Sequence, residues 1–472
     1  MSDLNFLSAV EMAARIRKKE ISPVALVQAH LDRIAQLQPK LNAFVQIDEA
    51  RALESARKAE AAVMRGDIPG PLHGVPLSIK SSMDVAGLRT ESGTRLRAGM
   101  MAERDGTLVG RLKAAGAIIL GTTNSPELLM AWETDNALYG RTNNPWDLSR
   151  TPGGSSGGEA AAIASGCSAG GMGSDGGGSI RVPAHFSGIC GLKPTPGRIP
   201  STGHFPASLG PFAMIGVVGP MARRIADLKV LFEVMQGADD GDPSSAPVPV
   251  RWPGDEEMKK IRIGYFEDDG RTPVTQETRA AVRKAAALLR DAGFDVAPFR
   301  PGGLERARQL WWKFFGIAGG MLLGPMTKGR DSELSEILRE FHSWVAAEPS
   351  HTGESLLEAW LGRDEVRLQV FAEMQEFQVL LCPAAAVPAF RHRERCWEID
   401  GQTVKYLDAW SYTEWFNLLG TPAVAVPISQ TAEGLPIGVQ ISAKPWQEEI
   451  VLAVAAELEK SRGPFPHPGE LA

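Results

Sequence analysis

Cysteine and histidine are scarce in this chain of 472 residues, which has four cysteines and eight histidines. The cysteines show no C-x-x-C spacing, and no histidine cluster accompanies them; they are Cys167, Cys190, Cys382 and Cys396. This pattern argues against a zinc site and against a disulfide framework. We therefore expect reduced thiols and no bound metal.

Long apolar runs and a strong net charge are also missing. No apolar run approaches the roughly 20 residues of a membrane-spanning helix, and residues 1–6 lack the basic and apolar parts of a signal peptide. The net charge is −6, with no long basic run. This charge gives no support for a nucleic-acid partner or an anionic membrane surface. We expect a soluble cytoplasmic protein that binds neither nucleic acid nor membrane.

Glycine is abundant, with 50 residues, and it concentrates in residues 151–181. A Gly/Ser-rich segment is often a flexible linker. Here, however, residues 158–165 are mostly good helix formers, and the stretch ends in Ile-Arg-Val-Pro. Serines stand at both glycine turns, where a hydroxyl would be exposed to a ligand. These features favour an active-site scaffold.

Helix and strand patterns alternate along the chain, which is typical of α/β proteins. We divide the chain into an N-terminal helical layer, a central core, a linker-like loop and a C-terminal part, at residues 1–66, 67–237, 238–258 and 259–472. Within the last part, residues 304–377 are helical and rich in aromatic side chains, most of which we expect in a core and some at a substrate pocket. The Pro/Gly-rich run 197–219 is a candidate binding loop.

Lys80 ends a short apolar strand that begins at Gly74. A strand interior is a costly place for an ammonium group unless the group is paired or neutral. Alternatively, Lys80 extends its charged end into solvent at a strand edge. Both interpretations stay open on this segment alone.

Two formal motif matches fail for lack of context. Residues 154–158 match the G-x-S-x-G nucleophile elbow around Ser156, but no strand precedes them. Residues 171–176 match the dinucleotide motif G-x-G-x-x-G, but neither an apolar strand nor a helix flanks them. There is no Walker A motif, and we expect no cofactor. His185 lacks an acidic partner and is unsupported as a base.

A serine nucleophile without histidine needs another base. Desolvation lowers the pKa of a buried lysine, so that the neutral amine becomes available, and Lys80 fits this description. Gly176, Gly177, Gly178 and Ser179 offer consecutive backbone N–H groups with little side chain in the way. Such a run is suited to an oxyanion hole.

A long part of the chain is similar to the signature of a known enzyme family. Pro-Gly-Gly-Ser-Ser-Gly-Gly at 152–158 is followed by Gly-Ser-Asp-Gly-Gly-Gly-Ser at 173–179 and Gly-Leu-Lys-Pro-Thr at 191–195. These segments resemble the amidase signature enzymes, closely over residues 70–240 and again over 408–461. The resemblance implies an α/β fold in which a large twisted mixed β-sheet is sandwiched between layers of α-helices, as a single amidase domain over residues 1–472.

The resemblance also implies site residues. Ser179 matches the nucleophile, Ser155 the bridging serine that follows a cis peptide bond, and Lys80 the base. Positions that support the site match Asn124 and Asp175, and Arg181 could pair with Asp175. The acyl side of the pocket matches Leu128, Leu129, Met130, Ala131 and Trp132. Gly176 replaces a bulkier residue of the family, which predicts a looser oxyanion loop and an open pocket.

The function implied is hydrolysis of the C–N bond of small apolar or aromatic amides, with activity on aryl esters and carbamates (urethanes). The resemblance allows a homodimer. Three alternatives remain at this point: a fatty-amide hydrolase, a non-catalytic binding protein and a glutamyl-tRNA amidotransferase A-type subunit. The first lacks an anchor here, the second does not explain three intact catalytic positions, and the third lacks a matching glutamine-binding segment.

Overall fold

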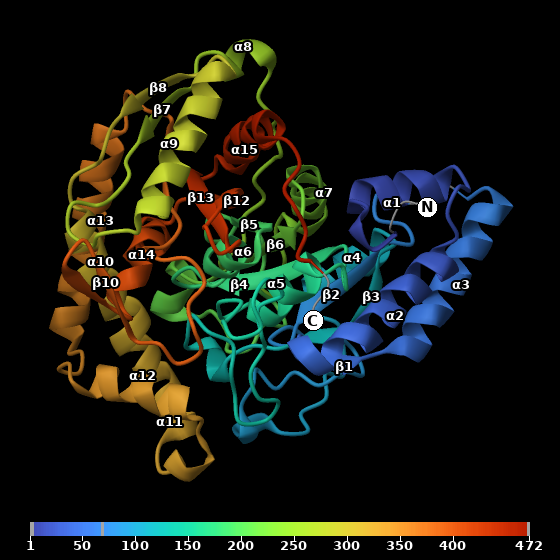
Figure 1. The fold of residues 1–472 in the computed structure, drawn as a ribbon. Helices are drawn as coiled ribbons and strands as arrows, with labels where there is room; N and C mark the ends of the chain where they lie inside the picture. The colour runs from blue at the N-terminus through green and yellow to red at the C-terminus, as the bar shows by residue number, and fades with distance from the viewer. Residues whose placement is uncertain (1–3, 68–69, 470–472) are drawn as a thin grey trace.

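The computed structural model describes residues 4–67 and 70–469, in which one large sheet lies between helices (Figure 1). The predicted outer limits of the domain, residues 1 and 472, lie outside the described residues. The sheet has eleven strands, in the spatial order β1 (Phe44–Ile47), β3 (Ile118–Thr123), β2 (Pro76–Lys80), β4 (Gly170–Asp175), β6 (Val217–Ala222), β5 (Cys190–Lys193), β12 (Ala423–Gln430), β13 (Pro436–Ala443), β9 (Val379–Pro383), β7 (Arg262–Tyr265) and β8 (Asp295–Pro298). The predicted α/β architecture with a mixed sheet is confirmed.

Strand directions bring two carboxyl ends together at the centre of the sheet. β2 runs parallel to both β3 and β4. From β4 to β13 the neighbouring strands are antiparallel. Every residue of β2 and β4 is buried. The ends of β2 and β4 therefore meet at one edge of the sheet, where ligand sites of α/β proteins collect.

The glycine-rich run contains a strand that the sequence did not predict. β4 has the sequence Gly-Gly-Met-Gly-Ser-Asp and pairs with β6 over its whole length. A Cβ atom at Gly171 would collide with the Ser78 carbonyl oxygen and the Glu159 carboxylate. Small residues are thus required by close packing on both sides, and they leave no apolar alternation by which a strand could be recognised.

The N-terminal layer is helical, as predicted, but it also completes the sheet. Its helices are α1 (Ala9–Arg17), α2 (Pro23–Leu41) and α3 (Glu49–Arg65). A capping box of Ser8 and Glu11 starts α1, and the Ser22 side chain caps α2. Between α2 and α3, β1 pairs with β3 at the sheet edge. This edge strand was missed because it has only four residues.

The remaining helices cover the sheet or, between residues 304 and 419, form the C-terminal wall on the left of Figure 1. They are α4 (Thr107–Ala114), α5 (Gly157–Ala164), α6 (Arg181–Ser187), α7 (Ile225–Met235), α8 (Asp255–Met258), α9 (Gln276–Asp291), α10 (Leu304–Trp312), α11 (Gly319–Thr327), α12 (Glu336–Ala346), α13 (Gly353–Glu373), α14 (Ser411–Leu419) and α15 (Glu448–Arg462). Short helical turns are η1 (Leu4–Phe6), η2 (Arg95–Arg97), η3 (Glu127–Leu129), η4 (Gly210–Met214), the π-helical η5 (Lys313–Ala318), η6 (Asp331–Glu333) and η7 (Asp408–Trp410). A separate hairpin joins β10 (Cys396–Ile399) to β11 (Gln402–Lys405). Across residues 4–67 and 70–469, we find no helix with the length and apolarity needed to cross a membrane.

The loop at 238–258 is fastened to the body of the protein. The Asp239 carboxylate accepts a hydrogen bond from Thr107 (2.8 Å), and the Asp242 carboxylate accepts one from the Ser201 N–H (2.8 Å). Trp252 packs against the main hydrophobic core. Strands before and after the loop belong to the same sheet. The loop therefore crosses the surface of one continuous sheet structure.

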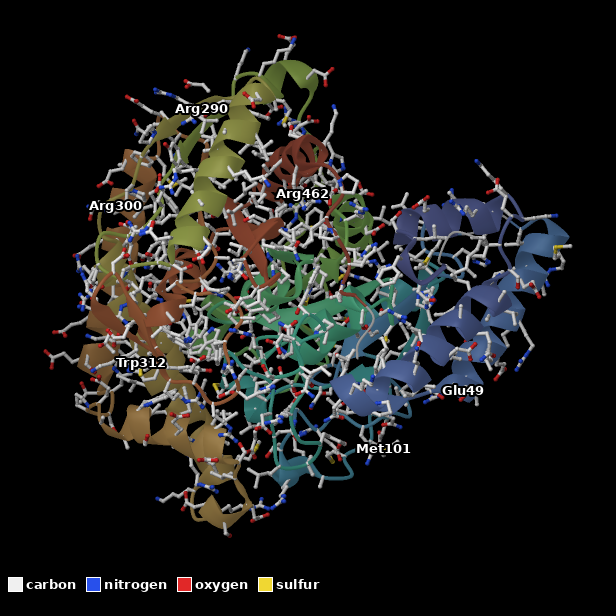
Figure 2. The ribbon with its side chains drawn as sticks, in the orientation of Figure 1. Glu49, Met101, Arg290, Arg300, Trp312 and Arg462 are labelled. Carbon is white, nitrogen blue, oxygen red and sulfur yellow. The ribbon has the colours of Figure 1, made fainter. Side chains whose placement is uncertain are left out.

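The aromatic residues of 304–377 form a second core, as expected for most of them. Trp311, Phe314 and Phe341 are among the largest fully buried side chains. Charged side chains such as Glu49, Arg290 and Arg300 instead lie at the periphery (Figure 2). The aromatic core lies against the carboxyl end of β4, through contacts of Trp311 and Phe315 with the turn that follows this strand.

Candidate active site

Three separate segments bring the predicted catalytic residues to the edge where β2 and β4 end. Lys80 is the last residue of β2, and Ser155 lies in the turn before α5. Ser179 lies in the turn between β4 and α6. The Ser156 N–H donates to the Ser179 carbonyl oxygen (3.1 Å), which joins the two glycine turns. The peptide bond between Gly154 and Ser155 is cis, as the resemblance implies.

The Lys80 ammonium is buried among hydroxyl groups. Its side chain is 1% exposed, and Nζ lies 2.7 Å from Ser155 Oγ, 3.0 Å from Ser156 Oγ and 2.9 Å from Ser174 Oγ. Burial lowers the pKa of Lys80 to about 7, although the nearby Asp175 and Glu159 carboxylates oppose this change. The alternative in which Lys80 reaches solvent is wrong. Near neutral pH a large fraction of this amine is neutral and able to accept a proton.

Ser179 presents its hydroxyl to a cavity. The residue is 8% exposed and lines the cavity together with Ser155. Within the described part of the chain, no group hydrogen-bonds to the Ser179 hydroxyl. The Ser179 hydroxyl is thus available to a ligand. Ser155, which lines the same cavity, is already hydrogen-bonded to Lys80.

Asp175 holds the turn that carries Ser179. Its carboxylate accepts hydrogen bonds from the N–H groups of Gly178 (2.7 Å) and Ile180 (3.1 Å). It also forms an ion pair with Arg181 (3.0 Å), in which both side chains are 0% exposed. Burial alone would raise the pKa of the Asp175 carboxyl, but Arg181 holds it well below its usual range. The predicted pairing of Arg181 with Asp175 is confirmed.

The same contacts correct the predicted oxyanion hole. The Gly178 N–H is committed to Asp175 and does not face a ligand. The carbonyl oxygens of Gly176 and Gly177 accept hydrogen bonds from the indole N–H groups of Trp311 (2.7 Å) and Trp132 (2.9 Å). Among residues 4–67 and 70–469, no acceptor engages the N–H groups of Gly176, Gly177 and Ser179. These three N–H groups are therefore the candidates for an oxyanion hole.

The cavity beside Ser179 is compact and mostly apolar. Its volume is about 60 Å³, and Leu128, Leu129 and Met130 line it as predicted. Ala131 and Trp132 do not line it, which corrects the predicted wall. Trp132 is instead buried in an aromatic cluster with Trp410 and Tyr406, because its indole binds the Gly177 carbonyl.

Gly176 does not open the pocket, contrary to expectation. A Cβ atom at this position would lie 3.0 Å from the Phe315 ring and 3.8 Å from the Phe212 ring. Both rings line the cavity. The space left by the missing side chain is therefore filled by aromatic residues from η4 and η5, two segments distant in sequence.

Asn124 supports the site from a distance. Its side chain donates to the Gly140 carbonyl (3.0 Å) and accepts from Asn136 (2.7 Å). Its carbonyl accepts the Gly158 N–H (3.2 Å) at the start of α5. Asn124 thus ties the loop after β3 to the helix that follows Ser155.

Several polar residues at the site were not predicted. Ser174 and Ser156 bind Lys80, and Asn417 donates to the Asp175 carboxylate (3.0 Å). Glu159 accepts hydrogen bonds from Ser78 (2.6 Å) and Thr123 (2.7 Å). Burial raises the pKa of Glu159 to about 7, against the effect of these bonds. In the sequence, the one indication of these additional site residues was that Ser174 lies inside the glycine-rich run.

His185 is a structural residue. Its Nδ1 accepts the Gly438 N–H (2.7 Å), and its Nε2 lies 3.1 Å from the Val387 carbonyl oxygen. Burial lowers the pKa of His185 to about 4, so the ring is neutral near pH 7. Both ring nitrogens are occupied by backbone groups, which agrees with its rejection as a base.

Comparison with known proteins decides the family. The Amidase family model matches residues 25–452. The chain belongs to the amidase family, whose signature it carries. It is 33% identical to indoleacetamide hydrolase of Bradyrhizobium diazoefficiens, over 98% of this chain and 87% of that protein. It is also 33% identical to acylamidase of Rhodococcus erythropolis, over 98% of this chain and 96% of that protein.

A solved amidase structure has the same fold. A bacterial aryl acylamidase of the amidase signature family superposes with a TM-score of 0.86 and 28% identity, over 98% of this chain and 97% of that one. Membership in the amidase family assigns the chain to hydrolases that act on the C–N bond of amides. These relatives are named for different amides, so the substrate must be argued from the cavity.

Proposed function

We propose that this amidase hydrolyses small apolar or aromatic amides through an acyl-enzyme on Ser179. The observation that carries this proposal is the buried Lys80 ammonium, 2.7 Å from the Oγ of Ser155, which lines the same cavity as Ser179. A lysine whose pKa lies near 7 is matched to general-base work at neutral pH. Ser179 as the nucleophile and Lys80 as the base, linked by Ser155, are sufficient for the reaction proposed below.

In the proposed reaction, Ser179 Oγ attacks the carbonyl carbon while its proton passes through the Ser155 hydroxyl to neutral Lys80. The N–H groups of Gly176, Gly177 and Ser179 stabilise the oxyanion that forms. The C–N bond then breaks, and the leaving amine takes a proton back from Lys80 through Ser155. Water attacks the acyl-enzyme by the same relay, which releases the carboxylic acid and restores the Ser179 hydroxyl.

The cavity favours a short, uncharged acyl group. Its apolar lining includes Leu128, Met130, Phe212 and Phe315, and its volume is about 60 Å³. The one carboxylate at its edge, Asp175, is already paired with Arg181. Aryl esters and carbamates share the acyl-enzyme route, and we propose them as further substrates.

A hydrolysis panel on the purified protein tests this function. We expect turnover of para-nitroacetanilide and of the matching aryl ester and carbamate, with weaker turnover of long-chain acyl anilides. Ser179→Ala should lower each rate by at least about 10³-fold. Ser187→Ala, a buried serine on the adjacent α6, is the matched control and should keep the activity. Retained anilide hydrolysis in Ser179→Ala would refute the proposal.

A further inference from the structure

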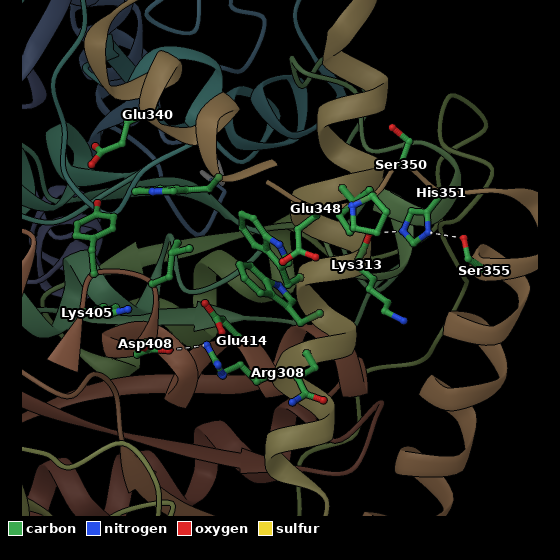
Figure 3. A pocket seen from close by; sticks show the side chains of 18 of the residues that line it. Arg308, Lys313, Glu340, Glu348, Ser350, His351, Ser355, Lys405, Asp408 and Glu414 are labelled. Atoms are coloured by element: carbon green, nitrogen blue, oxygen red, sulfur yellow. Dashed lines mark hydrogen bonds and ion pairs between the residues drawn. The ribbon is translucent and has the colours of Figure 1, made fainter. Parts of the chain in front are cut away.

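A second and larger cavity lies in the C-terminal helical region (Figure 3). Its volume is about 1080 Å³, and its walls come from α10, η5, α12 and the segment that follows β11. It shares no described lining residue with the cavity beside Ser179. The proposed hydrolysis uses none of its charged side chains, so these groups need a separate explanation.

Aromatic rings form part of the wall of this cavity. Trp311 and Tyr406 are 1% and 3% exposed, and Trp344 is half-buried. The Trp344 and Tyr406 rings are 5.8 Å apart at an angle of 31°. Such surfaces bind flat apolar groups and also attract cations through the ring faces.

The two arginines that line this cavity already form ion pairs with carboxylates. Arg308 pairs with Asp408 (2.8 Å), as the dashed line in Figure 3 shows. Arg395 pairs with Glu340 (2.9 Å) and with Glu133 (2.7 Å). Arg308 Nε is buried without a hydrogen bond to a described residue and lies 3.5 Å from a Glu305 carboxylate oxygen. Both arginines thus form ion pairs with carboxylates other than Glu414.

Glu414 is the exception, because it is buried without a complete set of partners. The residue is 1% exposed, and its Oε1 makes no hydrogen bond to any described residue. Burial raises the pKa of Glu414 well above its usual range; Arg308 opposes this, and Asp408 and Glu305 add to it. A buried polar atom without a partner costs free energy, and a bound cation would favour the ionised carboxylate, so that binding would release the Glu414 proton to solvent.

The two lysines that line this cavity do not supply a cation to Glu414. Figure 3 shows Glu414 in the middle of the view, with Lys405 on one side and Lys313 on the other. Lys405 is exposed, as is the carboxylate Glu348. In the described part of the chain, neither lysine forms an ion pair with Glu414. The inner wall of the cavity thus contains a buried carboxyl group for which the described residues provide no ion pair, beside aromatic rings.

We propose that this cavity binds an organic ammonium ion with a flat apolar body. Its nitrogen would pair with Glu414, and its body would pack against Trp311, Trp344 and Tyr406. A cavity of this size holds a ligand as large as a typical small-molecule cofactor or drug. This site is separate from the proposed hydrolysis, and neither proposal depends on the other.

An occupant of the cavity would also contact the support of the oxyanion turn. The Trp311 indole donates to the Gly176 carbonyl and stacks on Phe315 with ring centroids 4.6 Å apart. Phe315 lines the cavity beside Ser179. Binding at Glu414 should therefore change kcat for a substrate while leaving substrate binding nearly unchanged, in addition to giving a direct binding signal.

Calorimetric titration with phenethylammonium chloride tests the proposal directly. Phenethyl alcohol has the same body without the charge and should bind at least about tenfold more weakly, as expected for the loss of a charge-assisted hydrogen bond. Glu414→Gln should weaken phenethylammonium binding by about tenfold, whereas Glu348→Gln at the exposed rim should change it by less than about twofold. Equal binding of amine and alcohol, or unchanged binding in Glu414→Gln, would overturn the proposal.

Two further experiments control for misfolding of the variant and for binding of the amine in the cavity beside Ser179. If Glu414→Gln does not fold, as judged by circular dichroism, Trp344→Leu serves instead and should weaken the amine by several-fold. In the Ser179→Ala protein, saturating acetanilide should leave phenethylammonium binding within about twofold, because the cavities share no lining residue. Displacement of the amine by acetanilide would assign it to the catalytic cavity and refute the second site.

Discussion

Burial and the surrounding charges change the pKa of Lys80 in opposite directions. Burial removes water from the ammonium and lowers its pKa, while Asp175 and Glu159 raise it, and the result is about 7. The Ser155, Ser156 and Ser174 hydroxyls accept hydrogen bonds from the Lys80 ammonium. A hydroxyl can also donate to a neutral amine, so both forms of Lys80 are accommodated. Lys80 is thus about half neutral near pH 7, and in the proposed mechanism it stops acting as the base when it becomes protonated.

The pH dependence of kcat/KM follows from this balance. Because the neutral amine is the base, we expect kcat/KM to fall about tenfold per pH unit below pH 7, where Lys80 becomes protonated. Glu159, whose own pKa is about 7, raises the pKa of Lys80 when it is ionised, so Glu159→Gln should move the midpoint modestly to lower pH. Anilide hydrolysis measured between pH 5 and pH 9 checks both points. A flat profile across pH 7 would contradict the role of Lys80.

Trp311 tests whether the orientation of the oxyanion turn depends on one indole N–H. Trp311→Phe keeps an aromatic ring but removes the hydrogen bond to the Gly176 carbonyl. We expect kcat to fall by about tenfold with a smaller change in KM, because the turn stabilises charge that develops in the transition state. Trp360→Phe, in the same helical region, should retain kcat. Equal kcat values for both variants would rule out the positioning role.

At the scale of single residues, the signature motifs led to Lys80, Ser155 and Ser179, which the structure brings together. Trp132 was assigned to the wrong surface. Its neighbours Leu128 to Met130 do line the cavity, but its indole reaches the Gly177 carbonyl, 45 positions along the chain. The commitment of the Gly178 N–H to Asp175 is likewise a local geometry that residue types do not encode.

At the scale of elements, the turn between β4 and α6 is fixed by one buried ion pair. Arg181 also donates to Gln440 (3.0 Å) and to Asn417 (2.6 Å), which links α6 to β13 and α14. Asp175→Asn leaves the Arg181 charge without its partner. We expect the free energy of unfolding to drop by about 3–5 kcal/mol.

Urea denaturation of the Asp175→Asn protein measures this change. The control is Glu256→Gln, which removes the exposed ion pair with Lys259 and should cost less than about 1 kcal/mol. If both variants lose the same small amount, the ion pair does not hold the turn.

Elements with clear periodicity or caps were predicted well, and elements built from small residues were not. α1 and α2, which carry capping signals, lie in the layer that was predicted to be helical. β4 was missed because glycine side chains give no alternation, although its burial is complete. Its shape depends on Glu159 and Ser78 packing against it, which is tertiary information.

At the scale of the whole molecule, the sheet continues across the loop at 238–258. β7, β8 and β9 extend the same sheet as β1 to β6, through β12 and β13. We propose that the chain unfolds as one unit, and scanning calorimetry should show a single endotherm. Two well-separated endotherms would indicate that the loop divides independent domains, as linker-like composition alone suggests.

The most direct test of the proposed mechanism is to locate the acyl group during turnover. An aryl ester is mixed with excess enzyme, quenched rapidly with acid, digested and analysed by mass spectrometry. We expect the acyl mass on the peptide that contains Ser179, and its absence in Ser179→Ala. An acyl group on Ser155 or Ser156, or continued turnover with no acylated serine, would contradict the proposed mechanism.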